Sequence, residues 1–310
     1  MMDYKRANRA YLYMILATIA FVIVYSGWII MTGRDISLIA NNAFCELMIL
    51  LPAVIVVLFS GDRLSVLMPF KKVKITTVLF TLLYTVMLYP LSILANSISM
   101  LFVKNRVLEL SEQILKLPMW QMLLSIGIFG PLVEEIVFRG VMLHSYQRTG
   151  RIIGSIVLSS FLFGLMHMNF NQFFYGFLLG IMLALLVEAT GSVLTSFIAH
   201  ATFNSVEVLM MYASKDVLGD AQDYLNDSQL MQSAQLWSIG IYFIMAVIAT
   251  SIAICIAYKI SEIEGRNAFF ANIPKCKKGG YKLISIPLVL AVLISFSYMI
   301  YFELLSRLGY

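Results

Sequence analysis

Uninterrupted apolar segments of about 20 residues recur from one end of this chain to the other. A helix of that length crosses the hydrocarbon core of a bilayer, which is about 30 Å thick. Within that core every backbone N–H and C=O must find a partner inside the protein. Long continuous runs achieve this as helices, whereas barrel strands are shorter and alternate in polarity. The chain is therefore predicted to be an all-α, polytopic transmembrane helical bundle.

The apolar runs predict eight or nine spans. Their ranges are 11–31, 43–60, 76–103, 119–147, 152–168, 171–189, 192–213, 235–258 and 283–304. The fifth and sixth runs are separated only by the tetrapeptide MNFN, so the count is open by one. No internal repeat, low-complexity segment or soluble domain interrupts the series, and residues 1–310 are predicted to form a single integral membrane domain.

Composition supports this class and excludes others. The 310 residues are 60% hydrophobic and 13% charged, against about a quarter charged in soluble domains. The net charge of +5 does not indicate nucleic acid, because the basic residues are spread over loops instead of one patch. The first apolar run follows Lys5, Arg6 and Arg9 and is too long for a signal-peptide core, so an uncleaved first span is expected.

The loop charges predict an orientation. Lys and Arg gather in the N-terminal tail, in loops 61–75 and 259–282, and at Arg148 and Arg151, all on one side if the spans alternate. Loop 214–234 falls on the opposite side and is acidic, with Asp216, Asp220, Asp223 and Asp227. Short cytoplasmic loops are enriched in Lys and Arg, so the N-terminus is predicted to be cytoplasmic and, with nine spans, the C-terminus external.

Two further features fit this frame. Segment 104–118 has apolar positions at helical spacing, which suits either an interfacial helix or an ordinary amphipathic connector. The three cysteines, Cys45, Cys255 and Cys276, lack metal-binding or CxxC spacing and are interpreted as small hydrophobic side chains.

Ionisable residues within the spans are the strongest functional signal. A charge at the centre of a membrane helix costs roughly 2.5–3.5 kcal/mol on the insertion scale, and it persists when it is paired or lines a wet cavity. Eight such residues occur here, and five of them fall in three short motifs. The eight are Glu46, Glu134, Glu135, Arg139, His167, Glu188, His200 and Glu207.

The first motif is EEIVFR, from Glu134 to Arg139. Glu135 and Arg139 are four residues apart, so they share a helix face and can pair. Glu134 is rotated by about 100° from Glu135 and is free for another task. Such a carboxylate is a candidate general base. Pro131, three residues earlier, lacks a backbone donor and is expected to kink the helix.

The other two motifs lie on the fifth and seventh runs. Phe163 and His167 are four residues apart in FGLMH, and His200 and Asn204 are four residues apart in HATFN. An imidazole and an amide one turn apart can hydrogen-bond a developing oxyanion or help to hold a metal.

The remaining ionisable residues receive weaker interpretations. His144 lies near the end of the fourth run and is interpreted as interfacial and not catalytic. Glu188 lies near a span end and stays ambiguous, whereas Glu46 and Glu207 fit either pocket residues or buried hydrogen-bond partners.

These three motifs, in this order on successive runs, resemble those of the CPBP intramembrane proteases, which include the type II CAAX prenyl endopeptidases and the bacterial Abi proteins. The resemblance covers roughly 119–210. It implies hydrolysis of peptide bonds in a membrane-embedded cavity. By position, Glu134 would activate water, and Glu135 and Arg139 would set its charge and orientation. His167 would bind the water, and His200 and Asn204 would stabilise the oxyanion.

Cofactor and substrate stay open at this point. The family is commonly described as metalloproteases, and a divalent metal such as zinc, held by His167, His200 and a carboxylate, is one alternative. Direct activation of water by Glu134 and His167 is the other, since the HExxH zinc motif is absent. The expected partners are a peptide or protein substrate, with or without a lipid group, and the lipid bilayer. The compact architecture favours a bacterial plasma membrane. The resemblance to bacterial members of the family implies a role in bacteriocin or peptide processing or in self-immunity.

Two other functions compete with protease. A proton-coupled transporter would also place Glu, His and Arg within its spans, but transporters show inverted repeats or broken helices in corresponding halves, and none is evident. A non-enzymatic membrane adaptor or immunity protein with the same fold is the stronger rival. The intact motifs weigh against it, because a silent relative would be expected to lose Glu134 or a histidine.

Overall fold

The computed structural model describes residues 1–105, 110–215, 228–273 and 282–308, and throughout these ranges the chain is helical or connects helices. The predicted all-α class is confirmed. Seven helices belong to the outer parts of the bundle or to its ends: α1 (Tyr4–Thr32), α2 (Leu38–Leu58), α4 (Ile75–Val86), α5 (Tyr89–Ser99), α15 (Ser228–Ile263), α16 (Asn267–Asn272) and α17 (Ile286–Arg307), with the short α3 (Leu64–Leu67) and α7 (Ser111–Leu115) between them.

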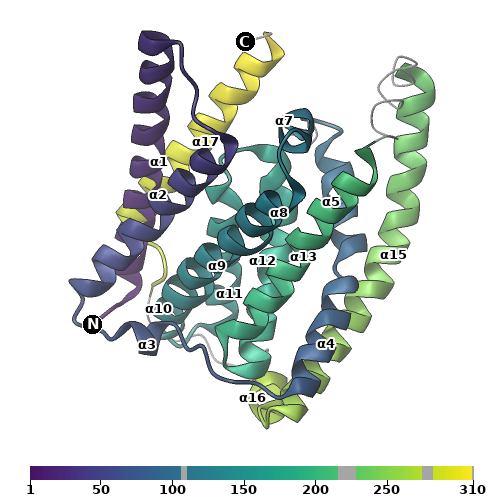
Figure 1. Cartoon of the computed structure of the whole chain (residues 1–310). Helices are drawn as coiled ribbons and strands as arrows, with labels where there is room; N and C mark the ends of the chain where they lie inside the picture. Colours follow the sequence, from purple (N-terminus) through teal and green to yellow (C-terminus); the bar gives the residue numbers. More distant parts are fainter. Residues whose placement is uncertain (106–109, 216–227, 274–281, 309–310) are drawn as a thin grey trace.

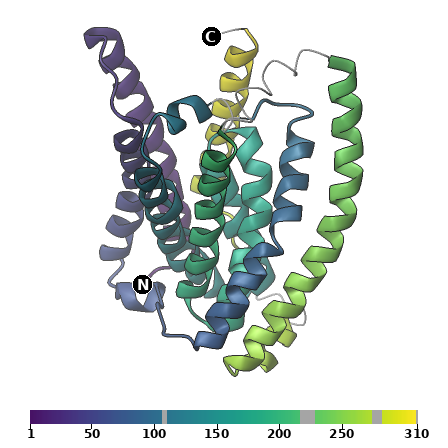
Figure 2. The ribbon, with the colours of Figure 1, turned by 45° about the vertical axis from the view of Figure 1, so that its right-hand side comes forward.

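The inner part of the bundle is built from one composite helix and three further helices. The composite helix, residues 119–147, is followed by α11 (Ile152–Met166), α12 (Phe170–Thr190) and α13 (Val193–Ala213). In both views α1 and α2 lie on one flank and α15 on the other (Figures 1 and 2). The most apolar 18-residue window of α12 is 61% buried, against 11% for α1, so α12 is central and α1 peripheral.

Eight helices within the described ranges are long and apolar enough to cross a membrane, and α11 is shorter. The N- and C-terminal ends nevertheless lie at opposite ends of the bundle (Figure 1). The chain therefore traverses the bundle an odd number of times, and α11 supplies the ninth, short traverse. This agrees with the predicted eight or nine spans.

The predicted basic loops meet at one end of the bundle. The backbone N of Lys74 donates to Glu264 Oε1 at 3.0 Å, and its Nζ donates to the Ile263 carbonyl. Arg148 forms an ion pair with Asp62 at 2.8 Å, which ties the turn after the composite helix to loop 61–75. Which side of the membrane this end faces stays a prediction.

Some predicted features fall partly or wholly outside the described residues. Loop 214–234, with Asp216, Asp220, Asp223 and Asp227, is mostly outside them, as is Cys276. Of segment 104–118, residues 106–109 are outside, and the described part contains the helix Ser111–Leu115. Cys45 and Cys255 are free thiols.

Candidate active site

The composite helix changes its winding around the first motif. It consists of α8 (Met119–Met122), a π-helical η1 (Leu123–Phe129), α9 (Gly130–Glu134), a π-helical η2 (Glu135–Leu143) and α10 (His144–Gln147). Pro131 lies in the first turn of α9, directly after η1. Because proline has no backbone N–H, one helical hydrogen bond is absent where the π-helical segment ends. Short π-helical segments recur at functional sites because they change the direction of side chains. Glu134 and Glu135 lie at the junction of α9 and η2.

The predicted pairing of Glu135 and Arg139 is present and fully buried. Arg139 Nη1 lies 2.8 Å from Glu135 Oε1, with 1% and 0% of the two side chains exposed. Arg139 Nη2 also donates to the carbonyl of Gly180 at 3.3 Å, and its guanidinium lies 4.3 Å from the centroid of the Phe163 ring. The cation is therefore committed to three groups inside the bundle, and it balances the charge of Glu135.

Small residues bring α11 and α12 into close contact beside this pair. A Cβ atom on Gly180 would lie 2.9 Å from Ser160 Cβ, and one on Gly164 would lie 2.7 Å from the Phe173 carbonyl oxygen. Small residues spaced four apart let membrane helices approach closely. This contact fixes Phe163 and His167 on the α11 side, facing the composite helix.

The position of His167 is set by the turn between α11 and α12. Its Nδ1 lies 3.0 Å from the carbonyl oxygen of Phe163. Because a carbonyl only accepts, Nδ1 carries the proton and Nε2 is left as an acceptor in the neutral ring. The chain then reverses through Met168, a non-glycine residue at φ 55°, and Asn169 caps α12 by accepting from Gln172 N at 2.8 Å.

His200, on α13, bridges the two glutamates. Its Nδ1 lies 2.9 Å from Glu135 Oε1, and its Nε2 lies 3.5 Å from Glu134 Oε2. On the other side of Glu134, His167 Nε2 lies 3.9 Å from Glu134 Oε1. Glu134 keeps 15% of its side chain exposed and His167 keeps 19%. Glu135 is thus buried in an ion pair with Arg139, whereas Glu134 is partly exposed and faces one nitrogen of each histidine ring.

Asn204 lies one turn further along α13 and has a different neighbour. Its Nδ2 donates to the carbonyl of Ile126 in η1 at 3.3 Å, and the adjacent Ser205 Oγ lies 3.5 Å from the Gly127 carbonyl. These contacts join α13 to η1 directly before the motif glutamates. The amide nitrogen carries two protons, so Asn204 Nδ2 can donate to a second acceptor besides the Ile126 carbonyl.

The side chains do not form a metal-ligand cluster in this arrangement. Zinc is bound at about 2.0–2.2 Å by nitrogen and carboxylate oxygen ligands, usually by three or more protein groups. Among the described residues, no three His, Cys, Asp or Glu side chains are placed to share one ion. Imidazole nitrogen and carboxylate oxygen are nevertheless the types of donor that zinc prefers.

Two ionisable residues of the spans lie apart from this cluster. Glu188 accepts from Gln147, and its carbonyl accepts from Arg266 Nε at 3.1 Å, near the basic end of the bundle. His144 Nδ1 contacts the carbonyl oxygens of Arg139 and Gly140 at 2.7 and 3.1 Å.

Two groups complete the cluster: Phe163, which the FGLMH motif contains but to which the sequence assigned no role, and the Gly180 carbonyl, which the sequence did not indicate. The Phe163 ring carries Arg139 on its face and meets the His167 and His200 rings edge-on at 5.1 and 5.7 Å between centroids. The second group is the Gly180 carbonyl. The four-residue spacing of Gly176 and Gly180 was the available signal for close helix packing there.

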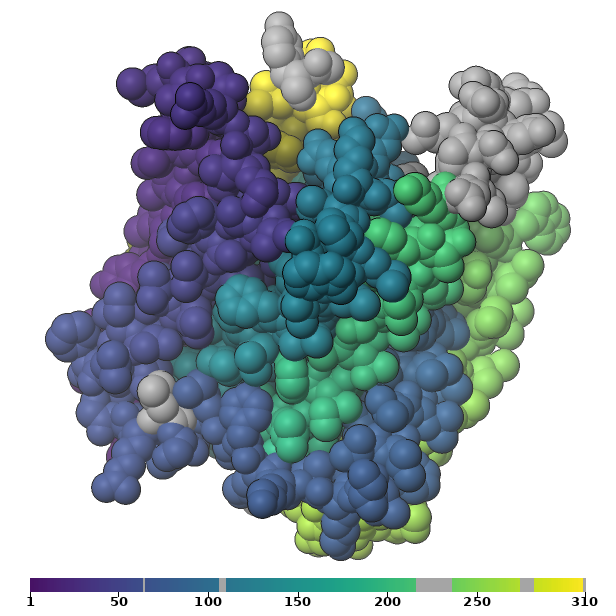
Figure 3. Space-filling model, viewed as in Figure 1, coloured from purple at the N-terminus to yellow at the C-terminus, as the bar shows by residue number. Residues whose placement is uncertain are grey.

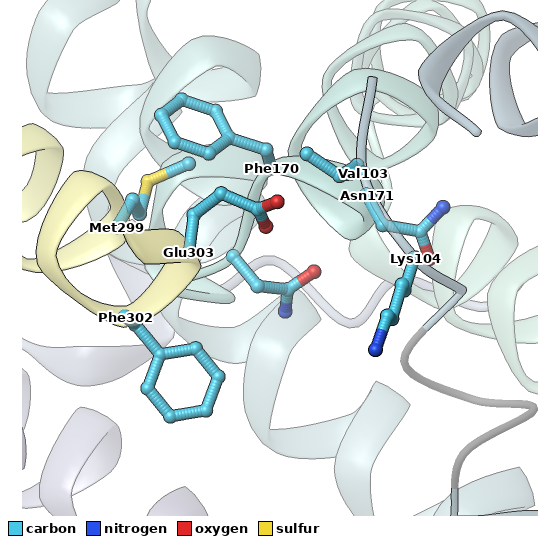
Figure 4. A pocket seen from close by; sticks show the side chains of 8 residues that line it. Val103, Lys104, Phe170, Asn171, Met299, Phe302 and Glu303 are labelled. Atoms are coloured by element: carbon cyan, nitrogen blue, oxygen red, sulfur yellow. The ribbon is translucent and has the colours of Figure 1, made fainter. Parts of the chain in front are cut away.

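Parts of the composite helix and of α13 form the surface on the face shown in Figure 3. Trp120, Leu124 and Met210, which belong to these helices, are exposed. A small hollow adjoins the turn after His167 and is lined by Asn169, Phe170 and Asn171 together with residues of 103–104 and of α17 (Figure 4).

One family model matches the part of the chain that contains the three motifs. The model of the family described as type II CAAX prenyl endopeptidase Rce1-like matches residues 116–206, just under a third of the chain. The matched segment is similar to this Rce1-like family. It contains the three motifs and corresponds closely to the stretch 119–210 that carried the resemblance. Searches of curated proteins and of solved structures gave no match.

The Rce1-like match supports a protease, and with eight described helices able to span a membrane the chain is an integral membrane protein.

Proposed function

We propose that this protein is an intramembrane endopeptidase in which Glu134 activates water for attack on a peptide bond. The observation that carries the proposal is the convergence of His167 Nε2 and His200 Nε2 on the two oxygens of Glu134, at 3.9 and 3.5 Å. Glu134 and Nε2 of the neutral His167 ring are both acceptors, so a water between these two groups has a partner for each of its protons. The accessible 15% of Glu134 gives such a water a way in.

In the proposed reaction, the motif residues accept and donate every proton that moves. Water donates one hydrogen bond to Glu134 and one to His167 Nε2. Glu134 takes the proton as the water oxygen attacks the carbonyl carbon. His200, in its doubly protonated form, and the remaining Asn204 proton donate to the oxyanion. Glu134 then gives its proton to the amine nitrogen as the C–N bond breaks.

Glu135 and Arg139 act through their neighbours in this scheme. Glu135 accepts from His200 Nδ1 at 2.9 Å, which fixes the ring orientation and stabilises the imidazolium, as the buried aspartate does in serine-protease triads. Arg139 neutralises Glu135, so Glu134 remains the carboxylate available as a base.

The substrate, the cell type and the orientation are parts of the same proposal. We infer a peptide or protein substrate, with or without a lipid group, in a bacterial plasma membrane with a cytoplasmic N-terminus. Peptide or bacteriocin processing and self-immunity are the roles that such an activity would serve. A non-enzymatic adaptor is the alternative outcome of the experiment below.

The test is cleavage of a quenched peptide library, with and without lipidated members, by purified protein in detergent. We expect wild type to cut and Glu134→Gln to lose about 10²–10⁴-fold in rate. Glu188→Gln is the matched control, since it changes a membrane carboxylate outside the cluster, and it should cut normally. Cleavage by Glu134→Gln at the wild-type rate would overturn the proposal and bring the adaptor forward.

Repeating the cleavage assay with a metal chelator tests whether the activity needs a metal ion. Because the described side chains do not share an ion, we expect activity to survive chelation. Loss of activity that zinc restores would replace direct water activation with a metal-bound water.

A further inference from the structure

The turn between α11 and α12 holds one residue in an unusual backbone conformation. Met168 has φ 55°, in the left-handed region that residues with a Cβ rarely enter. Among the residues that the structure describes, it is the only non-glycine residue at positive φ. Such a conformation persists only where the surroundings over-determine it, and it recurs at functional sites. The residue directly before it is His167, which faces Glu134.

Packing holds this turn on one side. The Met168 side chain is only 8% exposed and belongs to the hydrophobic core that includes residues of α1, α2 and α11. On another side the turn borders the small hollow of Figure 4, which Asn169 lines. Packing is therefore incomplete there, and hydrogen bonds are the remaining means of holding the turn.

The Asn169 side chain supplies these hydrogen bonds with every polar atom it has. Its Oδ1 accepts from Gln172 N at 2.8 Å, which caps the first turn of α12. Its Nδ2 donates one proton to the His167 carbonyl at 2.9 Å and the other to Gln172 Oε1 at 2.5 Å. Serine and aspartate cap helices equally well, but they lack this pair of N–H donors. Asn169 thus bonds the end of α11 to the start of α12.

The His167 ring contacts both helices that Asn169 joins. On α11, its Nδ1 lies 3.0 Å from the Phe163 carbonyl oxygen. On α12, a Cβ atom on Gly176 would lie 3.6 Å from His167 Cε1 and 3.7 Å from Nδ1, so the ring lies against bare backbone there. The direction of Nε2 therefore depends on how α12 is placed against α11, and Asn169 fixes that placement where the two helices meet.

We propose that Asn169 is a positioning residue that aims His167 Nε2 at the water beside Glu134. The inference rests on the proposed function and adds to it a residue outside the three motifs. Asn169 acts through the His167 carbonyl and through the start of α12, and it does not itself touch the water. A shift of the ring by about 1 Å would break the hydrogen bond between the water and Nε2, which is enough to slow a reaction substantially.

The test compares two substitutions of Asn169 in the cleavage assay. Asn169→Asp keeps the size and the capping oxygen and removes both N–H donors, and Asn169→Ser caps without adding charge. In both we expect kcat to fall by about 10- to 100-fold while KM changes by less than about twofold, because the water is misplaced and peptide binding is not. Ser37→Ala is the matched control. It removes the cap of α2, where Ser37 Oγ accepts from Ala40 N at 3.2 Å, and it should keep the wild-type kcat.

The ring signals of His167 give a second reading that needs no cleavage. The chain has three histidines, so labelling histidine alone with an NMR-active nitrogen isotope gives three sets of ring signals in micelles. His167→Gln identifies the set that belongs to His167. In wild type and Ser37→Ala we expect a single tautomer with the proton on Nδ1, as the Phe163 carbonyl requires. In both Asn169 variants the same ring should show mixed tautomers or broadened signals.

The two readings separate this inference from the protease. If wild type cuts no peptide, changed His167 signals in Asn169→Ser support the positioning role while the protease falls. If wild type cuts, unchanged His167 signals or a wild-type kcat in both Asn169 variants overturn the positioning role and leave the protease intact. Thermal unfolding is measured for each variant. Failure of both Asn169 variants to fold, while Ser37→Ala folds, would show that Asn169 serves stability alone and would also overturn the inference.

Discussion

Helices α1 and α12 are both apolar enough to span a membrane, yet they occupy opposite places in the bundle. The most apolar window is 11% buried in α1 and 61% buried in α12. Hydropathy therefore decides which segments enter the membrane but not which of them meet protein there. In α12 the difference comes from small and polar residues, such as Gly176, Gly180 and Asn171, which approach other helices or bond to them.

The largest expected difference in stability is between losing the buried Glu135–Arg139 pair and losing the exposed Glu303–Arg307 pair, which has the same four-residue spacing. Arg139→Met leaves Glu135 buried without its cation and should destabilise the protein by about 3–5 kcal/mol. Arg307→Met breaks the Glu303–Arg307 pair, in which the arginine side chain is 62% exposed, and should cost less than about 1 kcal/mol. Both are measured by unfolding in mixed detergent micelles. Equal losses in the free energy of unfolding would mean that burial does not make the Glu135–Arg139 pair more important for stability than the exposed pair.

A second contrast uses two membrane glycines. Gly180→Ala places a Cβ 3.1 Å from Ser160 Cα and 3.3 Å from Phe163, so α11 and α12 must separate, at roughly 1–3 kcal/mol. Gly27→Ala, in α1, meets nothing within 4 Å and should change stability by no more than about 0.5 kcal/mol. Thermal unfolding of both variants measures this. A neutral Gly180→Ala would show that the helix contact tolerates repacking.

The smallest effect concerns the loops outside the membrane, where pH can act. Burial opposes ionisation of Asp62, but the Met2 N–H and Arg148 outweigh it and lower the pKa of Asp62 in the folded state. Its stabilising contribution is therefore complete above the unfolded value of about 3.9 and is lost as the pH falls through the lower folded value. Asp62→Asn should flatten the acid side of the stability profile below about pH 4, by under about 1 kcal/mol. An unchanged profile would exclude this loop contact as a source of acid sensitivity.

The sequence was sufficient for the features that depend on one segment at a time. Apolar runs predicted the spans, and the four-residue spacing predicted the Glu135–Arg139 pair. The contacts of His200 with both glutamates depend on how α13 packs against the composite helix, which no local pattern encodes. The same holds for the π-helical turns around Glu134 and for the Phe163 ring under Arg139, because both follow from tertiary packing. Asn204 was expected near the oxyanion, and its contact with Ile126 could not be read from spacing.

The shortness of α11 has a consequence for the lipid around this protein. Its 15 residues give a rise of about 22 Å, against a hydrocarbon thickness of about 30 Å. One end of α11, at the turn with His167 or at Arg151, therefore lies below the lipid surface that the longer helices reach. Because Leu162 to Met166 are buried among neighbouring helices, protein and not lipid covers the end at His167.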